Sequence, residues 1–81
     1  MTHEEIEKKV ITIVAKCLSE DDSSIDINAN LRDEYGADSL DVVSIVMDVE
    51  KCFSISIDDR IAESIKTTKD VIDEVKRNVL D

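Results

Sequence analysis

The amino-acid sequence predicts an all-α fold, namely a small antiparallel bundle of three main helices and one short helix, with a long first loop. The 81 residues include no proline and one glycine, and 42% of them are apolar. These apolar residues recur at helical spacing, whereas turn-rich β folds contain more glycine and proline. A chain of this length makes one domain, so we expect a single domain over residues 1–81.

The first helix is expected to begin just after Thr2, because Thr2 and Glu5 have the spacing of a capping box. Over the next three turns or so, apolar residues recur at intervals of three and four, which predicts one buried face. The residues of this face are Ile6, Val10, Ile13, Val14 and Cys17.

From Ser19 to about Asp38 the sequence shows no helical periodicity and is rich in the turn formers Asp, Asn and Ser. We therefore expect a long loop without regular structure, which is unusual in a compact domain. Its apolar residues are expected to anchor it across the end of the bundle, and they are Ile25, Ile27, Leu31 and Tyr35.

The second helix should span residues 39–53. Asp38 is suited to cap its N-terminus, and Asp41 completes a pattern like a capping box. This arrangement would place the Ser39 hydroxyl at the exposed end of a rigid element, where another macromolecule could reach it. The apolar residues that follow core spacing are Val42, Ile45, Val46, Val49 and Phe53.

A second apolar stripe on this helix is displaced toward the side that bears Ser39, and it consists of Leu40, Val43 and Met47. One interpretation is a helix buried on two sides. The other is an exposed, adaptable apolar strip on which protein partners dock. In that case its polar rim would consist of Asp41, Ser44, Asp48 and Glu50.

Two further helices are expected. A short one over residues 58–64 would cover the bundle through Ile61, Ala62 and Ile65. The last should begin at the capping pair Thr67 and Asp70. Its apolar residues are Val71, Ile72, Val75, Val79 and Leu80.

The composition is strongly acidic, with 20 acidic and 10 basic residues and a net charge of −10. Nucleic acid is not expected as a partner, because phosphate backbones require clustered Lys and Arg. The acidic surface would attract basic patches on other proteins, although acidity alone also serves solubility. No apolar run is long enough to span a bilayer, so we expect no membrane insertion. We expect the protein to be a monomer.

The cellular location is expected to be a reducing compartment, because two cysteines far apart in sequence do not suggest a disulfide scaffold. The N-terminus also lacks the basic start and apolar run of a signal peptide. We therefore expect the cytoplasm, or an organelle matrix if a transit peptide has been removed.

Catalysis by Ser39 is not expected, because a serine nucleophile needs a nearby base and the only histidine is His3. Without other information, Ser39 would be an ordinary capping residue. A metal site is not expected either. The acidic loop after Asp22 has Ile27 where a calcium loop needs glycine, and the cysteines lack zinc-ligand spacing.

The segment around Ser39 resembles the phosphopantetheine attachment motif of acyl carrier proteins. The residues that carry this resemblance are Gly36-Ala37-Asp38-Ser39-Leu40, followed by Asp41-Val42-Val43. It extends from residues 28–31 through residues 46–50 and Phe53 to Ile65 and Ile72. The resemblance therefore covers most of the chain, at the length and acidity of that family.

The resemblance implies that Ser39, flanked by Asp38 and Leu40, carries a covalent 4′-phosphopantetheine donated by coenzyme A. A phosphopantetheinyl transferase would attach it, and acyl groups would then be carried as thioesters to fatty-acid synthase enzymes with basic docking patches. The protein would itself be no enzyme. The bundle interior would sheath the acyl chain, with Val46, Ile57, Ala62 and Ile65 as lining.

Three residues depart from the pattern of fatty-acid carriers. Ser44 and Lys51 stand where the second helix commonly bears acidic residues, and Asp58 follows Ile57 where proline is usual. These departures concern partner recognition. A carrier for polyketide, peptide or cell-wall aminoacyl chemistry therefore remains an alternative, as does an unmodified acidic helical module that only binds proteins.

Overall fold

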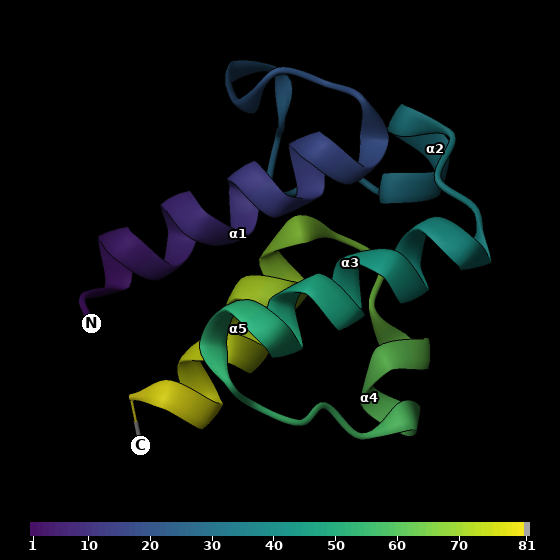
Figure 1. The fold of residues 1–81 in the computed structure, drawn as a ribbon. Helices are drawn as coiled ribbons and strands as arrows, with labels where there is room; N and C mark the ends of the chain where they lie inside the picture. Colours follow the sequence, from purple (N-terminus) through teal and green to yellow (C-terminus); the bar gives the residue numbers. More distant parts are fainter. Residues whose placement is uncertain (81) are drawn as a thin grey trace.

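The computed structural model describes residues 1–80 of the chain and confirms the all-α fold (Figure 1). In chain order the elements are α1 (His3–Leu18), the 3-10 turn η1 (Asp22–Ser24), α2 (Leu31–Tyr35), α3 (Ser39–Phe53), α4 (Asp59–Ser64) and α5 (Thr68–Val79). Within residues 1–80, no helix combines the length and the apolar character needed to cross a bilayer.

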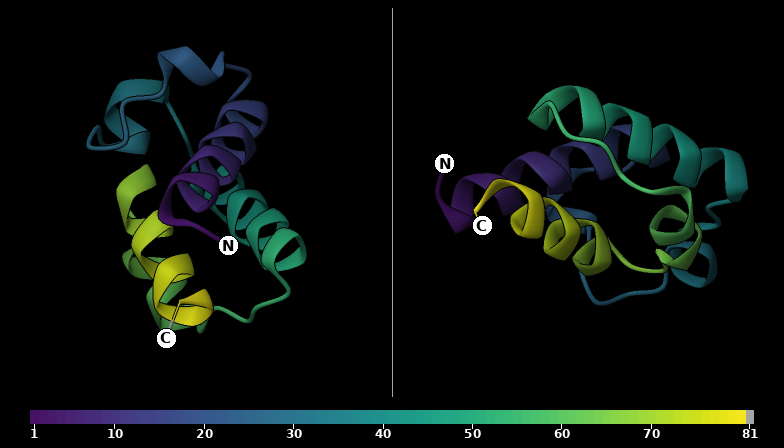
Figure 2. Two further views of the ribbon diagram at one scale, coloured as in Figure 1. Left: turned by 90° about the vertical axis from the view of Figure 1, so that its left-hand side faces the viewer. Right: turned by 90° about the horizontal axis from the view of Figure 1, so that it is seen from below.

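The three long helices form the bundle, and α1 packs against both α3 and α5. Figures 1 and 2 show that α1 runs antiparallel to the other two, so that the start of α3 lies at the end of the bundle away from the N-terminus. Each helix contributes one apolar face to the core. The fully buried aliphatic residues of these helices are Ile6, Val10 and Val14 of α1, Ile45 and Val49 of α3, and Val71, Ile72 and Val75 of α5.

All three long helices begin at a reciprocal capping box, as the sequence predicts. In α1 and α5 the cap residues are Thr2 and Thr67, and in α3 it is Asp38. The Glu5 carboxylate accepts hydrogen bonds from Thr2, and these bonds lower the pKa of Glu5. Each box satisfies backbone N–H groups that have no partner within the helix, so it fixes where the helix starts.

The prediction of a structureless first loop is wrong, because this segment contains η1 and the short helix α2. Asn30 caps α2, and its side-chain oxygen accepts from the backbone N–H groups of Arg32 and Asp33, both at 3.0 Å. Gly36 ends the helix in the left-handed conformation, with φ of 68°. The capping residues Asn30 and Gly36 can be recognised in the sequence. The helix between them was missed because five residues are too few to show a helical period.

The predicted anchoring of this segment is confirmed. Leu31 is buried, and Ile25, Ile27 and Tyr35 are partly buried against the core. The Tyr35 hydroxyl accepts a hydrogen bond from the Asp26 N–H at 2.7 Å and donates one to the Ser24 carbonyl at 3.1 Å. One side chain therefore closes the loop between η1 and α2.

Replacing Tyr35 with phenylalanine should remove both bonds and retain the packing of the ring. We expect Tyr35→Phe to lower the free energy of unfolding by about 1 kcal/mol, the usual contribution of a side-chain hydrogen bond. Urea denaturation measures this change, and amide exchange should show faster opening at Asp26. An unchanged exchange rate at Asp26 would contradict the assigned role of the hydroxyl.

Thr68 is a polar residue in the core, where it is fully buried at the start of α5. Within residues 1–80 its hydroxyl has no hydrogen-bond partner. A buried hydroxyl without a partner is destabilising, because it has lost its bonds to water.

Thr68→Val has nearly the same shape and no hydroxyl, so it should raise the free energy of unfolding by about 1 kcal/mol. The matched control is Thr67→Val, which removes the cap of α5 and should lower the free energy by about 1 kcal/mol. Denaturant midpoints of the two variants would then lie on opposite sides of the wild-type value. A loss of stability in both variants would show that the Thr68 hydroxyl is satisfied in solution.

Candidate functional site

Ser39 is the first residue of α3, and the residues before it hold it in place. Gly36 turns the chain out of α2, and Ala37 is buried with its N–H bonded to the Leu31 carbonyl at 3.2 Å. Asp38 then adopts the extended conformation of a capping residue. Ser39 is consequently exposed at the end of a 15-residue helix whose other end is built into the bundle.

The two carboxylates beside Ser39 both bond to the backbone. Asp38 Oδ1 accepts from the Asp41 N–H at 2.9 Å, and Asp41 Oδ2 accepts from the Asp38 N–H at 3.0 Å. Within residues 1–80, no hydrogen bond involves the Ser39 hydroxyl. The capping box thus positions the serine and leaves its oxygen accessible, as attachment of a phosphopantetheine group requires.

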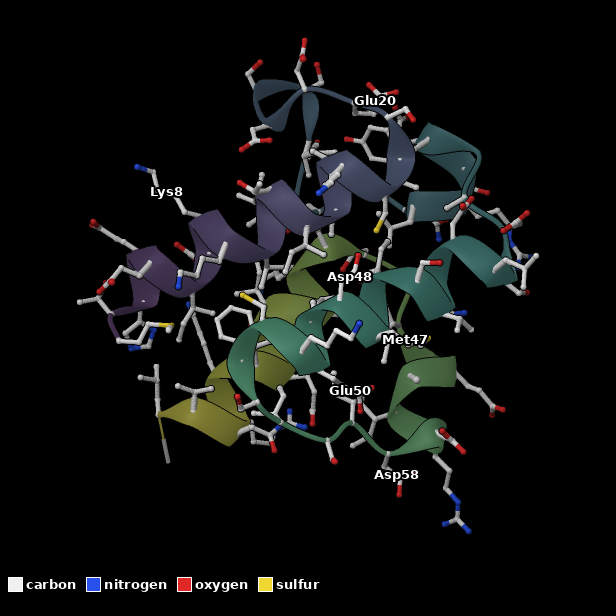
Figure 3. All side chains as sticks on the ribbon, viewed as in Figure 1. Lys8, Glu20, Met47, Asp48, Glu50 and Asp58 are labelled. Carbon is white, nitrogen blue, oxygen red and sulfur yellow. The ribbon has the colours of Figure 1, made fainter. Side chains whose placement is uncertain are left out.

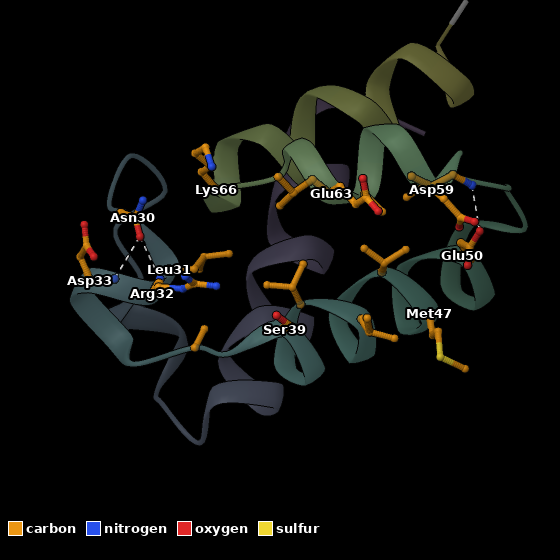
Figure 4. A pocket seen from close by; sticks show the side chains of 17 residues that line it. Asn30, Leu31, Arg32, Asp33, Ser39, Met47, Glu50, Asp59, Glu63 and Lys66 are labelled. Carbon is orange, nitrogen blue, oxygen red and sulfur yellow. Dashed lines mark hydrogen bonds between the residues drawn. The ribbon is translucent and has the colours of Figure 1, made fainter.

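A groove of about 650 Å³ opens beside Ser39, between α2, α3 and α4 (Figure 4). Its lining includes the four residues that the family resemblance pointed to, Val46, Ile57, Ala62 and Ile65. They come from three segments of the chain, and the structure brings them to one apolar surface. The groove runs along α3 from Ser39 toward Glu50.

The stripe of Leu40, Val43 and Met47 lies on the surface, with exposed fractions of 76%, 52% and 55%. The interpretation of α3 as a helix buried on two sides is therefore wrong, and the exposed strip is confirmed. Apolar side chains of this size rarely gather on a surface without a partner to bind. The structure thus leaves one face of α3 open to another macromolecule.

The polar residues around this strip are in different environments (Figure 3). Ser44 and Asp48 are exposed, whereas Asp41 is half-buried in the capping box. Glu50 is also half-buried, and its Oε2 accepts from the Ile57 N–H at 2.8 Å. The Glu50 side chain therefore holds the segment after α3 against α3 itself. Its carboxylate also adds negative charge beside the strip.

Cys17 and Asp48 form a contact between α1 and α3 that the sequence did not indicate. The thiol donates to Asp48 Oδ2, with the sulfur and oxygen 3.5 Å apart. Burial of the thiol, followed by the nearby carboxylate, raises the pKa of Cys17 above its usual value. Cys52 is exposed. Within residues 1–80 no His, Cys, Asp or Glu side chains cluster in a way that could hold a metal ion.

Several charged residues at the groove were also missed by sequence reasoning. Arg32, Asp33, Glu63 and Lys66 line it together with Ser39. Arg32 and Asp33 lie in α2, Glu63 in α4 and Lys66 in the segment between α4 and α5, and their proximity depends on tertiary contacts. No local signal in the sequence could have placed them at the site.

Comparison with known proteins agrees with this geometry. A model of the phosphopantetheine attachment site family matches residues 8–75, a range that includes Ser39 and most of the groove. The chain is 46% identical over 70 residues to an acyl carrier protein of Syntrophobacter fumaroxidans, covering 86% of both chains. It is 43% identical to one of Porphyromonas gingivalis, covering 93% of this chain and 96% of the other.

The fold has a counterpart among solved structures. An acyl carrier protein from Enterococcus faecalis superposes with a TM-score of 0.79 at 31% identity, covering 96% of this chain and 99% of that one. Because the family model and these relatives cover nearly the whole chain, the assignment extends beyond the motif around Ser39. This chain belongs to the acyl carrier protein family, and its domain is the one to which phosphopantetheine is attached.

Proposed function

We propose that this protein carries acyl intermediates of fatty-acid biosynthesis as thioesters on a 4′-phosphopantetheine arm bound to Ser39. The observation that supports this most strongly is the position of Ser39. Its exposed hydroxyl begins α3 within the region matched by the attachment-site family, and it borders a groove that has an apolar lining on one part and charged residues at its edges. The protein would act as a carrier and leave catalysis to its partners.

Attachment of the arm would join the Ser39 oxygen to the phosphorus next to the pantetheine part of coenzyme A. The serine hydroxyl gives up its proton, and adenosine 3′,5′-bisphosphate leaves as the pyrophosphate bond breaks. Asp38 and Asp41 each use a carboxylate oxygen to cap α3, so we assign neither of them the role of base in this step. A separate phosphopantetheinyl transferase would have to provide one.

The residues around Ser39 would also accommodate the phosphodiester. The N-terminus of α3 favours an anion, because its backbone N–H groups and the helix dipole point toward Ser39. Asp38 and Leu40 would flank the attached group, and the Asp38 carboxylate offsets part of the benefit by repulsion. When bound, the arm supplies a thiol that forms thioesters with acyl groups.

The groove offers a place for the acyl chain. Val46, Ile57, Ala62 and Ile65 form its apolar lining next to Ser39. A chain in contact with these side chains would be removed from water, which stabilises it by about 25 cal/mol for each Å² of buried apolar surface. The groove would thus shield cargo between visits to successive enzymes.

Partner docking is assigned to the exposed face of α3. Leu40, Val43 and Met47 would supply apolar contact, and Asp41, Ser44, Asp48 and Glu50 would form the rim. The partners are the transferase and fatty-acid synthase enzymes with basic patches, which acidic rim residues attract. We place the protein in the cytoplasm or an organelle matrix, as a monomer and without nucleic-acid partners.

Incubation of the unmodified protein with coenzyme A and a broad-specificity phosphopantetheinyl transferase should add the mass of one phosphopantetheine group. Ser39→Ala should show no gain, because the attachment oxygen is missing. Ser44→Ala removes another exposed serine of α3 and should gain the group as the wild type does. Intact mass spectrometry makes the measurement. No gain on folded wild-type protein would leave α3 as a surface that only binds proteins.

A charge reversal in the rim should weaken docking. Asp48→Lys should raise the KM of the transferase for the carrier about three- to tenfold, with less salt dependence than the wild type, because a favourable contact becomes repulsive. The control is Glu20→Lys, which makes the same charge change away from α3 (Figure 3). Steady-state kinetics on variants with unchanged thermal midpoints provide the test. Equal KM values for both variants would argue against docking on this face.

A further inference from the structure

We propose that Arg32 and Lys66 form a cationic pair that holds the phosphodiester on Ser39 at the entrance of the groove. This inference rests on the proposed attachment at Ser39. The two residues would direct the arm along the groove and keep it from extending into solvent. They are positioning residues, and neither takes part in a chemical step.

The fold ties together the two backbone segments that carry these residues, which come from distant parts of the chain. The Leu31 N–H donates to the Lys66 carbonyl at 2.9 Å, and Asn30 and Thr67 form an isolated antiparallel bridge. The start of α2 is thereby tied to the segment between α4 and α5. Because Ala37 is in turn bonded to Leu31, Ser39 belongs to the same fixed arrangement.

Arg32 and Lys66 both line the groove that Ser39 borders. Figure 4 shows them at the end of the groove near Ser39, with Glu50 and Met47 at the other end. Arg32 and Lys66 are therefore the basic residues at this end of the groove that could hold a phosphate bonded to the serine oxygen. Arg32 could donate two parallel hydrogen bonds to it, and Lys66 could act as a mobile point charge.

Both cations are available for such a role. The ion pairs within residues 1–80 are Lys69–Asp73, Lys76–Glu7 and Arg77–Glu74, and neither Arg32 nor Lys66 belongs to one. Within residues 1–80 most Lys and Arg side chains form no ion pair, and Arg32 and Lys66 are the two of these that line the groove. Asp33 and Glu63 also line the groove, so the attraction is reduced by their charge and remains sensitive to salt.

Binding of the phosphodiester by Arg32 and Lys66 would also affect how exposed the acyl thioester is. An arm held along the groove keeps its thioester near the apolar lining and away from solvent nucleophiles. Raising the salt concentration weakens exposed ion pairs and should release the arm.

The test uses the holo-protein carrying an octanoyl thioester, with Arg32→Gln, Lys66→Gln and the double variant. At low salt the variants should be cleaved by hydroxylamine about two- to fivefold faster than the wild type, as expected for loss of exposed ion pairs. Added salt should accelerate the wild type and have little effect on the double variant. The ³¹P chemical shift of the phosphodiester should change in each variant and return toward the wild-type value in Arg32→Lys.

The matched control is Arg60→Gln, which removes a positive charge from α4 at a residue that does not line the groove. It should leave both the ³¹P shift and the cleavage rate unchanged. Equal shifts and rates in the wild type and the double variant, with equal thermal midpoints, would overturn the inference while leaving the attachment intact. Failure of the wild type to gain the arm would instead contradict the proposed function, so the two results can be told apart.

Discussion

The arrangement of the site depends on Leu31, whose side chain is buried in the core and whose backbone bonds in two directions. Its N–H reaches the Lys66 carbonyl, and its carbonyl accepts from Ala37. One residue therefore connects the first loop, the segment before α5 and the approach to α3. Packing in the core fixes the position of Leu31. The hydrogen bond from Ala37 to Leu31 in turn fixes the backbone that leads to Ser39.

Helix α3 then combines two tasks in one rigid element. Its inner face contributes Ile45 and Val49 to the core, and its outer face presents Leu40, Val43 and Met47. Ser39 lies at its first turn, so the helix fixes the distance and orientation between Ser39 and this outer face. The capping box sets this relation, because it determines at which residue the helix begins.

The sequence predicted those features that depend on local interactions. The capping boxes at Thr2, Asp38 and Thr67 and the two stripes of α3 are patterns of neighbouring residues, and the start and end of α3 were predicted as observed. Helix α2 was not predicted, because its five residues are held by caps and by the burial of Leu31. The groove could not be derived, since spacing showed only that its lining was apolar. Its charged entrance depends on a backbone bond between residues far apart in sequence.

The hydrogen bond from Cys17 to Asp48 affects how readily Cys17 could react with an acyl thioester carried on the protein. A thiolate attacks thioesters, whereas a protonated thiol does so poorly. Burial, followed by the Asp48 carboxylate, raises the pKa of Cys17 and so disfavours its thiolate form. Cys17 is therefore a weaker nucleophile toward a thioester than an exposed cysteine without such a contact would be.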